Sequence, residues 1–157
     1  MRLFLIRHAQ AGDRISGQRD LYRPLTPKGH RRAQELAEML SEQGITHVMT
    51  SPAIRCVQTV APLANALGVE AEEHPELWEG TPAATVLTLL ENHPGAALAV
   101  CSHGDVIPDV IDALAKGGVP ISGRGCEKGS VWVLNHNGRT WTSASYFDRS
   151  HTRLPTT

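Results

Sequence analysis

Residues 1–12 read MRLFLIRHAQAG, and the interpretation of the whole chain starts from them. The apolar run 3–6 is bounded by charged residues, a pattern typical of a short buried strand in the middle of a sheet. The strand ends at Arg7, and His8 follows it before a turn of small residues. Because α/β proteins bind ligands at the ends of strands, an arginine and a histidine here indicate a candidate binding site.

The composition indicates one globular domain, residues 1–157, with a tail after about residue 148 that we expect to be frayed. The hydrophobic fraction of 41% is ordinary for such a domain, and no apolar run is long enough to cross a bilayer. With 15 basic and 16 acidic side chains, the formal net charge is -1. No overall field therefore draws the chain onto a nucleic acid polymer or a membrane, and neither is an expected partner.

Two features predict a cytoplasmic location. Arg7 and His8 interrupt the first apolar run, so the amino terminus does not have the pattern of a secretory signal peptide. The three cysteines Cys56, Cys101 and Cys126 are widely spaced and form no CxxC pair, which argues against a disulfide framework or a zinc knuckle. Such cysteine usage is typical of a reducing compartment.

Strand patterns alternate with helix patterns along the chain. Strands are indicated by apolar runs with polar ends, and helices by one apolar face behind a capping residue. The turn-prone HNG between the last two strands predicts an antiparallel hairpin. The expected strands lie in 2–7, 46–52, 97–105, 130–135 and 140–147, with an extended segment at 69–77. The expected helices begin at Pro27 behind Thr26 and stop at Gly44, run from Pro52 to about Leu67, begin at Pro82 behind Thr81, and span Asp105 to Lys116.

This alternation predicts a three-layer α/β/α sandwich around a mostly parallel central sheet, with right-handed crossover connections. In such sheets, ligands bind outside the carboxyl ends of the strands. Polar residues follow three of these ends: Arg7 with His8, Ser51, and Ser102 with His103. We expect these residues to converge on one edge of the sheet.

The candidate catalytic set at this edge contains Arg7, His8, Arg55 and His103, with Arg55 in the first turn of the helix after the second strand. Two arginines and two histidines would repel one another unless an anion lay between them. Phosphate fits, because guanidinium matches phosphoryl oxygens bidentately and stays charged. A neutral His8 imidazole is then the expected nucleophile, and a phosphohistidine the expected intermediate.

Five motifs occur in a defined order over nearly the whole chain. They are LIRHAQA (5–11), RPLTPKGHRRAQELAEML (23–40), TSPAIRCVQTVAPLA (50–64), PELWEG (75–80) and AVCSHGDVIPDVI (99–111). Together they resemble the histidine phosphatase superfamily, which is phosphoglycerate mutase-like, and within it the small SixA-type phosphohistidine phosphatases. By this resemblance, Arg7, Arg55 and His103 bind the transferring phosphoryl group, and His8 attacks it. The usual signature is Arg-His-Gly, whereas this chain has Ala9 in third place.

A general acid is the next expected component, because an alkoxide leaving group needs a proton and a phosphoramidate or diphosphate leaves more easily. In larger relatives a glutamate follows the third strand, and Glu79 in Leu77-Trp78-Glu79 is the matching residue. SixA-type members generally lack this acid, so Glu79 is alternatively a favourable charge at the start of the next helix. Glu76 and Asp105 are weaker candidates, and Asp105 is also expected to cap or begin a helix.

Substrate contacts are assigned to residues near the same edge. Ser102 precedes His103, and the basic loop that follows the first strand carries Arg14, Arg19 and Arg23. These arginines either contact a second phosphate or form a solvated basic loop. The RHA and SHGDVIPD patterns also resemble the phosphatase domain attached to Nudix domains in some bacterial MutT-type hydrolases, which implies nucleotide substrates.

The expected function is a hydrolase that transfers a phosphoryl group to His8 and then to water, acting on phosphohistidine of a partner protein. The alternatives are a phosphatase of nucleotides or other small phosphorylated metabolites, a mutase, and a binding module that holds a phosphorylated ligand without turnover. No metal or other cofactor is expected, because the remaining histidines show no ligand spacing. These are His30, His47, His74, His93, His136 and His151.

Overall fold

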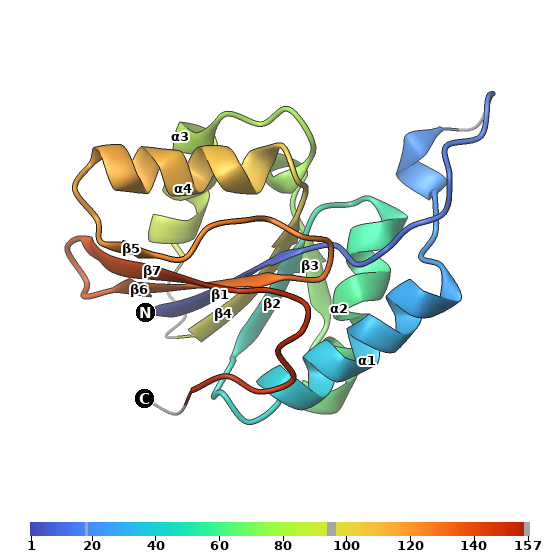
Figure 1. The fold of residues 1–157 in the computed structure, drawn as a ribbon, viewed down its shortest axis with the longest axis horizontal. Coiled ribbons are helices and arrows are strands. Elements are labelled where there is room, and N and C mark those ends of the chain that lie inside the picture. Colours follow the sequence, from blue (N-terminus) through green and yellow to red (C-terminus); the bar gives the residue numbers. More distant parts are fainter. Residues whose placement is uncertain (18, 94–96, 156–157) are drawn as a thin grey trace.

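The computed structural model describes residues 1–17, 19–93 and 97–155, and its centre is one sheet in the order β3-β2-β4-β1-β6-β7-β5 (Figure 1). The strands are β1 (Arg2–Arg7), β2 (His47–Thr50), β3 (Ala71–Glu73), β4 (Ala97–Ser102), β5 (Ile121–Ser122), β6 (Val131–His136) and β7 (Trp141–Phe147). The helices are α1 (Pro27–Leu40), α2 (Ile54–Leu67), α3 (Ala83–Glu91) and α4 (Val106–Lys116), with short 3-10 turns η1 (Asp20–Tyr22) and η2 (Pro75–Leu77).

Strands β3, β2, β4 and β1 run parallel, and the hairpin of β6 and β7 adds antiparallel strands beside β1. The sequence predicts both the parallel half and the hairpin, and both are confirmed. Strand β4 lies between β1 and β2, so the carboxyl ends of these three strands are neighbours.

Helices cover both faces of the sheet, with α1 and α2 against one face and α3 and α4 over the other (Figure 1). Alternate residues of a strand point to opposite faces, so β1 contributes to two cores. Phe4 and Ile6 pack in the cluster that includes residues of α1 and α2, whereas Leu3 and Leu5 pack in the cluster of α3 and α4. The predicted three-layer sandwich is confirmed.

Two predicted helix starts are wrong. The helix after β2 begins at Ile54 instead of Pro52, with Ala53 at the capping position. The next helix begins at Ala83, because the Thr81 hydroxyl donates to the carbonyl of Trp78 at 2.8 Å and caps no helix. The start of α1 is as predicted, since the side chain of Thr26 accepts a hydrogen bond from the backbone of Gly29.

Part of the described tail after residue 148 packs against the domain. Leu154 is buried in the cluster with α1 and α2. The guanidinium of Arg32 donates to the carbonyl of His151 at 2.9 Å. Within the described ranges, no helix combines the length and apolar character needed to cross a membrane.

Candidate active site

The ends of β1, β2 and β4 bring the predicted site residues together through the backbone itself. The amide of His8 donates to the carbonyl of Ser102 at 3.1 Å, and the amide of Ser51 donates to the carbonyl of Cys101 at 3.0 Å. The three strand ends are therefore joined by hydrogen bonds just where the polar residues leave the sheet. The predicted convergence on one edge is observed.

The imidazoles of His8 and His103 form the centre of the site, with ring centroids 5.6 Å apart in an edge-to-face arrangement. Both residues are almost fully buried. Burial lowers the pKa of His8 to about 3, and the positive charge of Arg55, with smaller contributions from His103 and Arg7, acts in the same direction. His8 is therefore neutral near pH 7 and can act as a nucleophile.

The residue after His8 is compatible with this conformation although it is not glycine. Ala9 is fully buried, and its amide donates to the Thr59 hydroxyl at 3.0 Å. Among the described residues, positive φ angles occur only at glycines, so Ala9 does not need the left-handed region.

Arg55, in the first turn of α2, is fully buried and lies between two carboxylates. Its Nη2 atom lies 3.0 Å from Oδ2 of Asp20 and also contacts Oε1 of Glu79. The same atom lies 3.3 Å from Nδ1 of His103. The guanidinium is thus aimed at the catalytic edge, where a phosphoryl group would compete with the carboxylates for its donors.

Arg7 is the last residue of β1, and its side chain packs against the backbone that follows β4. Its Nη1 donates to the carbonyl of Cys126 at 2.7 Å, and its buried Nε has no hydrogen-bond partner. A Cβ atom placed on Gly104 would lie only 2.6 Å from Cζ of Arg7, so the guanidinium packs on the residue next to His103. This close approach needs a glycine at position 104.

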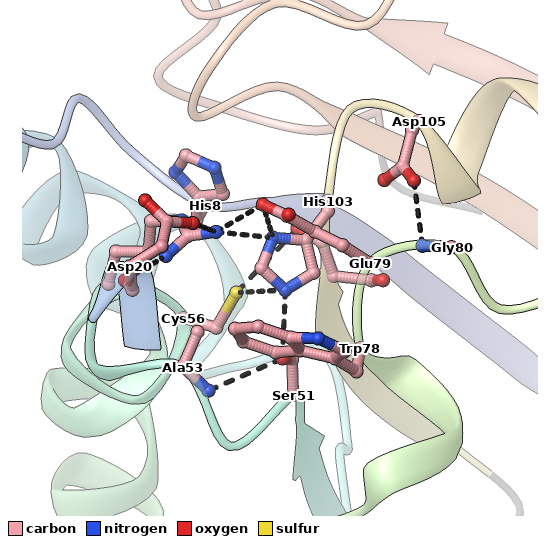
Figure 2. A network of polar contacts seen from close by, with 12 residues as sticks. His8, Asp20, Ser51, Ala53, Cys56, Trp78, Glu79, Gly80, His103 and Asp105 are labelled. Carbon is pink, nitrogen blue, oxygen red and sulfur yellow. Dashed lines mark hydrogen bonds and ion pairs between the residues drawn. The ribbon is translucent and has the colours of Figure 1, made fainter. Parts of the chain in front are cut away.

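The orientation of His103 is set by Ser51 at the end of β2. The Ser51 hydroxyl lies 2.8 Å from Nε2 of His103 (Figure 2). Because guanidinium can only donate, the contact from Arg55 requires an unprotonated Nδ1, and the proton of a neutral ring then lies on Nε2. Trp78 packs edge-on against the same ring, with centroids 5.2 Å apart, so this tryptophan lies beside the site.

Among the three candidate acids, only Glu79 lies in the cluster. Its Oε1 is 3.5 Å from Nδ1 of His103 and contacts Arg55. The carboxylate of Glu76 lies 3.7 Å from His74 instead. Asp105 occupies the capping position of α4, but its side chain accepts from the amide of Gly80 at 2.8 Å and caps nothing in α4.

The residues assigned to substrate binding separate into two groups. Ser102 is fully buried, and its hydroxyl donates to the carbonyl of Leu77 at 2.7 Å. The arginines of the basic loop line a surface groove of about 710 Å³ together with Asp20. They are Arg14, Arg19 and Arg23.

Asp20 is the functional candidate that the sequence analysis missed. Its carboxylate lies 3.5 Å from Arg14 and 3.0 Å from Arg23, in addition to its contact with Arg55. Burial alone would raise the pKa of Asp20, but the hydrogen bond from Arg23 and the charges of the three arginines lower it overall. The loop arginines are accompanied by two acids, Asp13 and Asp20, and only the fold shows that Asp20 reaches Arg55.

The assembled site can stabilise an anion and supply a nucleophile. Two guanidinium groups lie near the neutral His8, and guanidinium donors suit a tetrahedral phosphoryl group. The carboxylate of Glu79 adds a group that can carry a proton.

The family model described as histidine phosphatase superfamily (branch 1) matches residues 3–81. The 8-oxo-(d)GTP phosphatase of Mycolicibacterium smegmatis is 31% identical over 153 residues, which covers 92% of this chain and 47% of that protein. A protein of Serratia proteamaculans named probable phosphoglycerate mutase GpmB is 40% identical over 83 residues, which covers 50% of this chain and 38% of that protein. The chain therefore spans about half the length of the first relative and less of the second.

The solved structure of the protein histidine phosphatase SixA complexed with tungstate shares the fold. It superposes with a TM-score of 0.75 over 94% of this chain and 94% of that chain, at 23% sequence identity. Because the family model extends over half of the sequence and includes Arg7, His8, Arg55 and Glu79, the chain belongs to branch 1 of the histidine phosphatase superfamily.

Proposed function

We propose that this protein is a phosphatase that needs no metal ion and transfers a phosphoryl group first to His8 and then to water. One observation carries the proposal: the neutral imidazole of His8 lies edge-to-face with His103 at 5.6 Å, beside the buried guanidinium of Arg55. A nucleophile and preorganised cationic donors are the main requirements of phosphoryl transfer.

The first step forms a bond between Nε2 of His8 and phosphorus and breaks the bond from phosphorus to the leaving group. Arg7 and Arg55 stabilise the charge on the equatorial oxygens. The leaving group takes a proton from Glu79 when it is an alkoxide. In the second step a water oxygen attacks phosphorus, and the bond from phosphorus to His8 breaks. The proton of the water passes to the carboxylate of Glu79 or to solvent.

The proposed substrate is phosphohistidine exposed on a partner protein. Within the described residues, the strands and helices follow one another without an inserted cap domain. The likeness in fold to SixA supports the same substrate class. A phosphoramidate also makes the weakest demand on a general acid.

Nucleotides are the second candidate, and two observations favour them. Glu79 contacts both Arg55 and His103, so it is in place to protonate an alkoxide leaving group such as that of a nucleoside monophosphate. The groove of about 710 Å³ beside Asp20 carries three arginines that can contact further phosphates. The 8-oxo-(d)GTP phosphatase relative supports the same class of substrate.

The mechanism is tested by brief incubation with a labile phosphodonor, followed by denaturation. Acid-labile, alkali-stable phosphate should be found on His8 and should be missing in His8→Asn. A binding module would carry none, and turnover without any labelled chain would refute the mechanism. Rates measured side by side on a phosphohistidine peptide, nucleoside diphosphates and a sugar phosphate then identify the substrate class. Return of the phosphoryl group to another position of the sugar phosphate would identify a mutase.

A further inference from the structure

Three residues with metal-ligating side chains meet at the edge of the sheet although they are far apart in sequence. His47 begins β2, Glu72 lies in β3, and His93 follows α3. Each offers one ligand atom, and these three atoms all lie within 4.8 Å of one another. The sequence spacing gave no indication of such a set; the pairing of β2 with β3 builds it.

The ring of His47 is held in the tautomer that a metal ligand requires. The Thr46 hydroxyl donates to the carbonyl of Ala97 at 3.2 Å, so its oxygen accepts from Nδ1 of His47 at 2.9 Å. With the proton on Nδ1, the lone pair of a neutral ring lies on Nε2. Metal-binding histidines are typically oriented in this way by a hydrogen bond from their other nitrogen.

Glu72 has a second histidine beside it. Nε2 of His74 lies 3.6 Å from Oε1 of Glu72, too far for a hydrogen bond, and this buried nitrogen has no hydrogen-bond partner. A small movement of the Glu72 side chain, which is 43% exposed, would make that hydrogen bond. His74 is therefore placed to orient the carboxylate.

We propose that His47, Glu72 and His93 bind one zinc ion, with water as the fourth ligand. Zinc accepts two imidazoles and one carboxylate, whereas magnesium prefers oxygen ligands alone. Tetrahedral bonds of about 2.0–2.1 Å place ligand atoms about 3.3 Å apart. The observed spacing of up to 4.8 Å closes to this value by rotation of side chains, with no change in the sheet.

The proposed zinc site lies outside the catalytic cluster. His47 is at the amino end of β2, and Ser51 follows the carboxyl end of the same strand, about 13 Å away at 3.3 Å per residue. Strand β3 pairs only with β2 and forms the edge of the sheet. A bound ion would tie β2, β3 and the segment after α3 together, so its role is structural and does not depend on the proposed function.

The experiment is calorimetric titration of the metal-stripped full chain with zinc chloride, in parallel with thermal unfolding with and without zinc. The wild type should bind one zinc per chain and show a raised Tm. His47→Ala, His93→Ala and Glu72→Gln should each weaken zinc binding by at least tenfold and lose most of the rise in Tm. The matched control is His30→Ala, which removes an exposed histidine of α1 and should behave like the wild type.

A fourth variant separates ligation from general damage to the fold. Thr46→Val removes the hydroxyl beside His47 and leaves every ligand in place, and it should weaken zinc binding by roughly 10- to 100-fold. Equal zinc affinity in the wild type, His47→Ala and His93→Ala would overturn the proposal, because the ion would then be held elsewhere, for example by the catalytic histidines. A wild type whose Tm zinc does not raise would overturn it as well.

Discussion

The Nδ1 atom of His8 lies 2.8 Å from the carbonyl oxygen of Ala9, the next residue in the chain. A carbonyl oxygen can only accept a hydrogen bond, so Nδ1 carries the proton and the lone pair of the neutral ring is on Nε2. The backbone therefore selects the tautomer that leaves Nε2 free, which is the atom that the proposed mechanism uses for attack.

The buried, neutral state of His8 predicts a dependence of stability on pH. The pKa of His8 falls from 6.5 in the unfolded chain to about 3 in the fold, so between these values only the unfolded chain binds this proton. The contribution of neutral His8 to the free energy of unfolding is fully present above pH 6.5. It is lost as the pH falls towards 3, by up to about 1.4 kcal/mol per pH unit. Urea unfolding between pH 7.5 and pH 4 should show a flatter slope for His8→Asn than for the wild type. Parallel curves would contradict the buried neutral state.

Replacement of Arg55 should reduce turnover without abolishing substrate binding. Arg55→Ala removes a buried donor at the site of transition-state charge, for which the expected loss is roughly 10² to 10³ in kcat. Arg55→Lys keeps the charge but loses the planar fork, and should recover only part of the rate. Exposed Arg31 in α1 provides the control, and Arg31→Ala should be close to wild type. A loss below tenfold in Arg55→Ala would place this residue outside the reaction.

Glu79 separates substrates by their leaving groups. Glu79→Gln cannot donate a proton, so hydrolysis of alkyl and aryl phosphates should fall by roughly 10² or more, while hydrolysis of phosphohistidine should be spared. Glu76→Gln is the matched control, because its carboxylate faces His74. Equal losses on both substrate types in Glu79→Gln would remove the role of general acid.

Gly104 should be essential for the position of Arg7. In Gly104→Ala the new methyl group would lie 2.6 Å from Cζ of Arg7, so the guanidinium must shift, and turnover should fall by roughly 10². The backbone at Gly104 is not in the left-handed region, so the fold itself is not strained. Gly117→Ala at the other end of α4 meets its nearest neighbour at an ordinary 3.5 Å and should keep wild-type turnover. An active Gly104→Ala enzyme would show that Arg7 need not lie there.

The sequence was most informative where a strand ends. Apolar runs with sharp polar ends predict β1, β2 and β4, and the rule that ligands bind at the carboxyl ends of strands predicts that His8 and His103 lie close together. What it could not supply was the direction of individual side chains. Ser102 is adjacent to His103, yet its hydroxyl turns to the carbonyl of Leu77.

The sequence also could not predict contacts made by loop residues, or contacts that depend on the order of strands in the sheet. The segment before Asp20 has no periodicity, so nothing in its pattern shows that the carboxylate folds back onto Arg55. His47 and His93 meet, with ring centroids 4.6 Å apart, although they belong to different elements. Their proximity depends on which strands are neighbours, a property that local residue patterns do not encode.

The carboxylates of Asp20 and Glu79 on Arg55 have a consequence for selectivity among anions. These carboxylates partly neutralise the charge of Arg55, so an incoming anion gains only the difference between its own attraction to Arg55 and that of the two acids. Chloride or free orthophosphate offers few further contacts to make up this difference. A phosphorylated partner would bring the rest of its surface, so under the proposed function we expect Arg55 to select large esters and amides of phosphate over free orthophosphate.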